Sequence, residues 1–123
     1  MDADARKQIV SELAEAFGEA RDVTPDSGQP LHVLLSDLKL PSPWKPSPTR
    51  GLAKFENWPR QRPLFWVDLA LVNGDSQPPR SNSEQLVLGE TWRQFSFSFA
   101  WPIDPLTPMH AVLKWLTRFR EST

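Results

Sequence analysis

Proline limits the length of every helix and strand that this chain can form. The sequence contains 13 prolines, and most of them fall in three clusters, at residues 41–50, 59–63 and 101–108. A proline has a fixed φ and no N–H group, so it breaks the interior of a helix and is excluded from the middle of a sheet. The segments between these clusters must therefore hold the regular structure, as short strands and helices of a few turns.

Both ends of the chain have the spacing of amphipathic helices. In residues 3–19 apolar side chains recur at helical spacing, and Asp2 or Asp4 can cap the first turn. A second helix is predicted to begin after Thr107, a natural N-cap, with Pro108 in its first position. The apolar stripe of this second helix is predicted to contain Met109, Val112, Leu113, Leu116 and Phe119.

The residues between the helices predict about four strands, at 31–40, 51–57, 64–72 and 85–99. The run at 64–72 is almost continuously apolar, which is typical of a central strand. In the last of these segments Phe95, Phe97 and Phe99 alternate with polar residues, so one face of this strand is predicted to be buried.

Polar or proline-rich segments at 21–30, 41–50 and 73–84 separate these strands and are predicted to be loops. The four prolines of 41–50 predict an extended, unpaired loop. The order of elements predicts an α+β fold with an N-terminal helix, an antiparallel meander of about four strands and a C-terminal helix. A chain of 123 residues has the size of one domain, so we expect a single domain over 1–123.

Composition argues against several classes of function. The formal net charge of −1 argues against nucleic-acid binding, which needs a clear basic excess, and no apolar run is long enough to cross a membrane. The chain has no cysteine, and its two histidines, His32 and His110, lack the spacing of metal ligands. The acidic N-terminus lacks the pattern of a signal peptide, so we expect a cytoplasmic protein. We also expect no bound metal and no cofactor.

A motif ahead of the segment at 64–72 resembles a pattern of ubiquitin-conjugating (E2) enzymes. Trp58-Pro59, three further residues and Pro63 have the spacing of the family's Tyr-Pro-x-x-x-Pro motif. The family's Gly-x-x-Cys segment has a counterpart in Gly89-Glu90-Thr91-Trp92, and its Trp-x-Pro-x-Leu-Thr stretch is similar to Trp101, Pro105, Leu106 and Thr107. The resemblance extends over residues 3–120 and is nearest to the compact bacterial E2-like families. It implies the ubiquitin-conjugating-enzyme fold.

The chain departs from this family at the catalytic position. Trp92 stands where the family's cysteine would align, and an indole cannot form a thioester. The family's His-Pro-Asn motif is also missing, and only Asn82 could imitate its asparagine. Trp92 either fills the former active-site groove or packs in the core beside Phe95 and Val87. In both cases the sequence predicts a pseudoenzyme with no catalytic residue.

Basic side chains surround the proline motif, at Arg50, Lys54, Arg60 and Arg62. They form either an ordinary solvated face or a docking surface for an acidic protein. The residues predicted to bind a partner are Trp58, Arg60, Arg62, Trp92, Trp101, Pro102, Ile103 and Asp104. The resemblance implies that this partner is an activating-enzyme-like or ubiquitin-like protein of a bacterial conjugation system.

A second class of function is also compatible with the sequence. An unrelated small α+β domain could bind a small or carbohydrate-like ligand through exposed tryptophans, namely Trp44, Trp58 and Trp101. A neighbouring gene that encodes a ubiquitin-like protein or its activating enzyme would favour the first hypothesis over this one.

Overall fold

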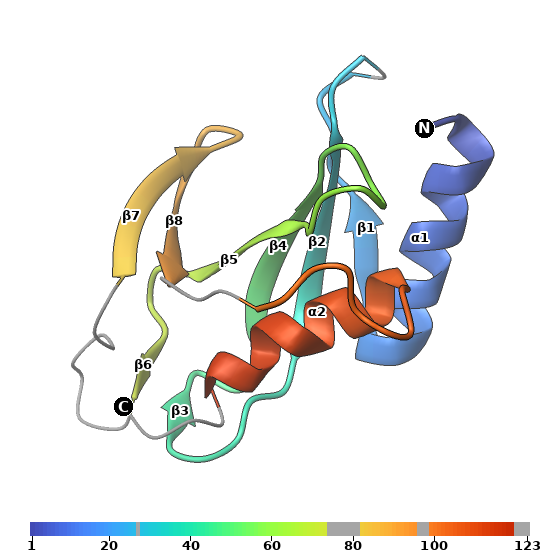
Figure 1. The fold of residues 1–123 in the computed structure, drawn as a ribbon. Helices are drawn as coiled ribbons and strands as arrows, with labels where there is room; N and C mark the ends of the chain where they lie inside the picture. Colours follow the sequence, from blue (N-terminus) through green and yellow to red (C-terminus); the bar gives the residue numbers. More distant parts are fainter. Residues whose placement is uncertain (27, 74–81, 96–98, 120–123) are drawn as a thin grey trace.

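Two helices pack against one face of a six-stranded antiparallel sheet in the computed structural model of this chain (Figure 1). The structure describes residues 1–26, 28–73, 82–95 and 99–119. The helices are α1 (Ala3–Phe17) and α2 (Pro108–Leu116), and the 3-10 helix η1 (Thr117–Phe119) follows α2 directly. The predicted α+β class, with a helix at each end of an antiparallel sheet, is confirmed.

The main sheet has two open edges, which are formed by β1 and β7 at its opposite ends (Figure 1). Between them the order is β1-β2-β4-β5-β8-β7, and neighbouring strands all pair antiparallel. These strands are β1 (Ala20–Asp22), β2 (Leu31–Leu38), β4 (Thr49–Phe55), β5 (Leu64–Asp68), β8 (Glu90–Phe95) and β7 (Asn82–Val87). A separate pair is formed by β3 (Trp44–Lys45) and β6 (Val72–Asn73).

Capping residues fix where both helices begin. The Asp2 carboxylate accepts a hydrogen bond of 2.8 Å from the N–H of Ala5, so Asp2 rather than Asp4 caps α1. Thr107 caps α2 in the same way, and Pro108 occupies the first turn as predicted. The predicted first helix is two residues too long, because Gly18 adopts a φ of 93° and ends it.

The face of α2 that packs on the sheet differs from the predicted stripe. Val112 and Phe119 are buried as expected, but Leu113 is 37% exposed and Met109 is only half-buried. Trp115 lies in the core instead, because its indole N–H donates to the Pro63 carbonyl at 2.7 Å. The buried face of α2 therefore contains Ala111, Val112 and Trp115, and Leu113 lies on the solvent side.

The segment predicted as one strand at 85–99 is a β-hairpin. Leu88 and Gly89 have φ values of 52° and 82°, and they form a two-residue turn between β7 and β8. Phe95 ends β8 in the core, and Phe99 is partly buried against that core outside any strand. Phe97 lies outside the described residues.

The segments predicted at 41–50 and 64–72 have a different structure from the one expected. The segment 41–50 is not an unpaired loop, since its Trp44–Lys45 pairs with Val72–Asn73 and Thr49 begins β4. The strand predicted at 64–72 ends at Asp68, whose carboxylate and carbonyl accept the N–H groups of Ala70 and Leu71. The main sheet therefore has six strands rather than about four. Of the loop predicted at 73–84, the structure describes only Asn73 and the start of β7.

The helices of the described part of the chain are too short or too polar to cross a membrane.

Candidate protein-interaction surface

Trp58 is anchored on the core at the turn between β4 and β5. Its ring meets the ring of Phe55 edge-on, with centroids 5.3 Å apart, and Phe55 is fully buried. Asn57 has a φ of 55°, and its carbonyl accepts the N–H of Arg60 at 2.7 Å. This turn holds the tryptophan against the core and leaves the Arg60 side chain exposed.

Trp101, which comes from a distant part of the chain, contacts Trp58 and Pro59 at this turn. Its indole N–H donates to the Pro59 carbonyl at 3.1 Å, and its ring lies 5.7 Å from the Trp58 ring at an angle of 60°. Both tryptophans are half-buried, so part of each ring remains accessible. Two of the three motifs that resemble the E2 family, those that contain Trp58 and Trp101, therefore meet in space.

Arg62 packs over aromatic rings rather than extending freely into solvent. Its guanidinium carbon lies 5.2 Å from the centre of the Phe99 ring and 5.5 Å from the centre of the Trp115 ring. At these distances a cation is attracted to the ring faces. Arg62 thus stabilises the junction between β5 and α2, whereas Arg60 is exposed.

A groove of about 420 Å³ runs beside these residues. We refer to Trp58, Arg60, Arg62 and Trp101, together with this groove, as the tryptophan–arginine surface. The groove is lined by Lys54, Glu56, Arg60, Gln61, Arg62, Leu64, Phe99 and Trp101. Three of these side chains are cationic and one is a carboxylate, which pairs with Lys54 at 3.3 Å. The surface therefore combines aromatic rings with an excess of positive charge.

Three of the other predicted partner-binding residues continue from Trp101. Pro102 and Asp104 are exposed and Ile103 is half-buried. They adjoin the tryptophan–arginine surface through the chain itself, although none of them lines its groove.

Trp92 lies in a different part of the molecule. It is only 3% exposed and forms a cluster with Leu52 and Trp66. The sequence predicted, as one alternative, that Trp92 packs beside Val87 and Phe95. Val87 does pack against this cluster, but Phe95 belongs to the core on the other side of the sheet. Side chains three residues apart on a strand point to opposite faces, so Trp92 and Phe95 cannot share a core. We therefore leave Trp92 out of the tryptophan–arginine surface.

Arg50 also differs from the other basic residues named above, because it covers the cluster around Trp92. Its guanidinium lies 4.7 Å from the centre of the Trp92 ring, pairs with Asp68 at 2.8 Å and also pairs with Glu90. Hydrogen bonds to Glu90 and then to Asp68 raise the pKa of Arg50. Burial would raise the pKa of Asp68, but the Ala70 N–H and Arg50 outweigh this effect and lower it. The charge of Arg50 is thus matched within the chain.

Trp44 is buried and does not offer a ligand platform. It is 5% exposed, and its indole N–H donates to the Phe119 carbonyl at 2.7 Å. The hypothesis of three exposed tryptophans is therefore wrong for Trp44. The sequence did not signal this burial, because Phe119 lies 75 residues further along the chain.

The histidines have structural partners. His32 is a buried strand residue whose Nδ1 lies 2.8 Å from the Pro30 carbonyl, and burial lowers its pKa. His110 Nδ1 lies 2.7 Å from the hydroxyl of Thr107 at the start of α2. Among the described residues no three histidine, aspartate or glutamate side chains converge as metal ligands.

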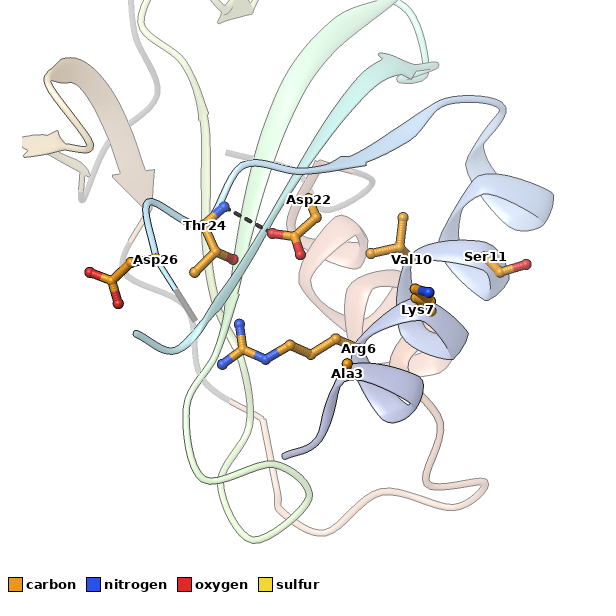
Figure 2. A pocket seen from close by; sticks show the side chains of 8 residues that line it. All are labelled: Ala3, Arg6, Lys7, Val10, Ser11, Asp22, Thr24 and Asp26. Atoms are coloured by element: carbon orange, nitrogen blue, oxygen red, sulfur yellow. Dashed lines mark hydrogen bonds between the residues drawn. The ribbon is translucent and has the colours of Figure 1, made fainter. Parts of the chain in front are cut away.

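A second groove, which the sequence did not indicate, lies between α1 and the turn after β1. It has a volume of about 520 Å³, and Figure 2 shows Arg6 reaching from α1 toward the turn that carries Thr24 and Asp26. Arg6 donates to the Gln29 carbonyl, and the Asp26 carboxylate accepts the Gly28 N–H. Acidic and basic side chains both line this groove, so it has no charge preference comparable to that of the tryptophan–arginine surface.

No protein-family model, curated protein or solved structure matches this chain. The side chains present at the tryptophan–arginine surface, indole rings and guanidinium groups beside a groove, are of the kinds that recur in protein recognition.

Proposed function

We propose that this chain is a non-catalytic, E2-like protein-binding domain whose partner docks on the tryptophan–arginine surface. The observation that carries this proposal is the contact between Trp58 and Trp101, whose ring centres are 5.7 Å apart beside the exposed Arg60. Tryptophan and arginine are over-represented among the residues that contribute most to protein–protein binding.

Both tryptophan rings are held in place before a partner binds, which supports the proposal of a binding surface. Trp58 rests on Phe55 and Trp101 is tied to Pro59, so neither ring has to be ordered when a partner arrives. A preformed surface loses less conformational entropy on binding. An aromatic or aliphatic side chain of the partner could pack on the accessible ring surface, while Arg60 and Lys54 attract its carboxylates.

The resemblance to ubiquitin-conjugating enzymes suggests the context of this binding. We infer an adaptor in a bacterial ubiquitin-like conjugation system, with an activating-enzyme-like or ubiquitin-like protein as the partner. Two features are compatible with this context: the Trp58-Pro59 motif precedes β5, and the Trp101 segment leads into α2. Trp92, in the position of the catalytic cysteine, is buried and cannot form a thioester.

The angle between the rings of Trp58 and Trp101 favours a protein over a carbohydrate as the ligand of this surface. The two indoles are inclined at 60°, so they do not present one flat face on which a sugar ring could lie. Trp44, the third tryptophan of that hypothesis, is buried.

A binding comparison between two charge-matched variants tests the proposal. Proteins captured from the native cell by the wild-type chain would be identified and titrated against Arg60→Glu and Lys39→Glu. Lys39 is exposed just after β2 and lies outside the groove, so its variant controls for the change in net charge. We expect loss of binding for Arg60→Glu only. Equal affinities of the two variants would contradict the proposal.

A further inference from the structure

Trp58 also lines a third groove, which lies between α1 and the first residue of α2 and has a volume of about 460 Å³. Its lining includes Asp2, Gln8, Glu12, Trp58, Pro59 and Pro108. We refer to it as the acidic groove, because its two charged side chains, those of Asp2 and Glu12, are both carboxylates. The groove therefore combines an indole ring with negative charge.

Main-chain groups hold both carboxylates of the acidic groove in place. Asp2 accepts the Ala5 N–H at 2.8 Å, and Glu12 accepts the Met109 N–H at 2.8 Å. One oxygen of each carboxylate makes this bond, so the other oxygen can accept a hydrogen bond from a ligand. The ion pairs within the described residues involve other carboxylates, and the basic side chains of α1 line the groove next to β1 instead. No ion pair within the described part of the chain therefore neutralises the acidic groove.

The two contacting tryptophans line grooves of opposite charge. Trp58 lines the acidic groove, and Trp101 lines the groove of the tryptophan–arginine surface, which has three cationic side chains and one carboxylate. Their ring centres are 5.7 Å apart, so the charge changes sign across a single pair of rings. A partner with acidic groups alone would be attracted on the side of Trp101 and repelled on the side of Trp58.

We propose that the partner places an arginine side chain in the acidic groove, while its acidic groups face Arg60 across the tryptophan pair. This inference rests on the proposed function, since it concerns the same partner. A guanidinium stacks on aromatic rings and donates two parallel hydrogen bonds to a carboxylate, whereas a lysine ammonium is a point charge. The groove offers both an indole and carboxylates, which favours arginine. Opposite charges on the two sides also fix the direction in which the partner docks.

Nuclear magnetic resonance titration with two short peptides tests the acidic groove without the partner. The capped peptide Gly-Arg-Gly-Arg-Gly is compared with the same peptide in which citrulline, an uncharged side chain of similar shape, replaces arginine. The indole N–H signal of Trp58, assigned by its loss in Trp58→Phe, reports on binding in this groove. We expect a saturable shift of this signal with the arginine peptide and a much smaller shift with the citrulline peptide.

Two charge-neutralising variants locate the binding. Glu12→Gln keeps an acceptor for the Met109 N–H but removes the charge, so it should weaken binding of the arginine peptide about two- to fivefold. Glu15→Gln is the matched control, because Glu15 is exposed on α1 outside the groove, and it should bind the peptide as the unchanged chain does. No saturable shift, equal shifts with the two peptides, or the same affinity for both variants would overturn the inference.

The variant that tests the proposed function separates the two proposals. Arg60 lines the other groove, so Arg60→Glu should not weaken binding of the arginine peptide. Weaker binding in Arg60→Glu would place the peptide outside the acidic groove and would also overturn the inference. If Arg60→Glu retains the partner while only Glu12→Gln weakens the arginine peptide, the acidic groove stands and the proposed function fails.

Discussion

The indole N–H of Trp101 donates a hydrogen bond to the carbonyl of Pro59, 42 residues earlier in the chain. This bond joins the segment before α2 to the turn before β5 and brings the rings of Trp101 and Trp58 into contact. Two short motifs that are far apart in sequence therefore form one surface before any partner is present.

Removing only this hydrogen bond should reduce the stability of the fold while an aromatic ring remains at position 101. Trp101→Phe keeps a ring but lacks the N–H group, and we expect it to lower the free energy of unfolding by about 1 kcal/mol. Trp58→Phe is the control, because no hydrogen bond of the Trp58 indole is observed among the described residues. Urea unfolding measures both variants. Equal losses for the two would mean that the bond to Pro59 adds nothing to stability.

Arg60 and Arg62 should respond differently to replacement by glutamate. Arg60 is exposed, so Arg60→Glu should leave the free energy of unfolding within about 0.5 kcal/mol while weakening an acidic partner by about one to several kcal/mol. Arg62→Glu loses the contacts with Phe99 and Trp115 and should also reduce stability, by about 0.5–1 kcal/mol. Thermal unfolding and titration calorimetry separate the two effects. If the stability losses are the same, the two arginines do not have the separate roles assigned to them.

Local signals in the sequence located the helices well. Thr107 with Pro108 marks the start of α2 by a capping mechanism that depends only on neighbouring residues. Asp2 acts in the same way on α1. The proline motif also pointed to the turn that holds Trp58, because two prolines so close together exclude regular pairing there.

Features that depend on distant residues could not be predicted. The burial of Trp44 requires Phe119, and the pairing of Trp44–Lys45 requires Val72–Asn73. The turn at Leu88 was missed because leucine rarely adopts a positive φ. Trp92 was assigned by its place in a motif, which gives no information on the face of the sheet to which a side chain points.

The ion pair that covers Trp92 should make stability depend on pH. The pKa of Asp68 is lowered in the folded chain, so its carboxylate stabilises the fold at neutral pH and this contribution is lost as the pH falls below about 4. Asp68→Asn should therefore cost roughly 1 kcal/mol or less at pH 7, and this cost should shrink as the pH falls below about 4. Urea unfolding of both proteins across this range measures the difference. A gap that stays constant with pH would exclude the ion pair as its origin.

Replacing Trp92 by cysteine should not create a conjugating enzyme. Trp92 is 3% exposed against Leu52 and Trp66, so Trp92→Cys leaves a cavity and should cost about 3 kcal/mol or more of stability. A thiol at this buried position has no path to a carbonyl carbon. Incubation with a ubiquitin-like protein and its activating enzyme should therefore give no reducible conjugate on a gel. Thr91→Cys, exposed on the same strand, is the control for thiol reactivity and should react readily with a thiol reagent. A reducible conjugate on Trp92→Cys would mean that the site opens to solvent and that the chain retains a latent transfer site.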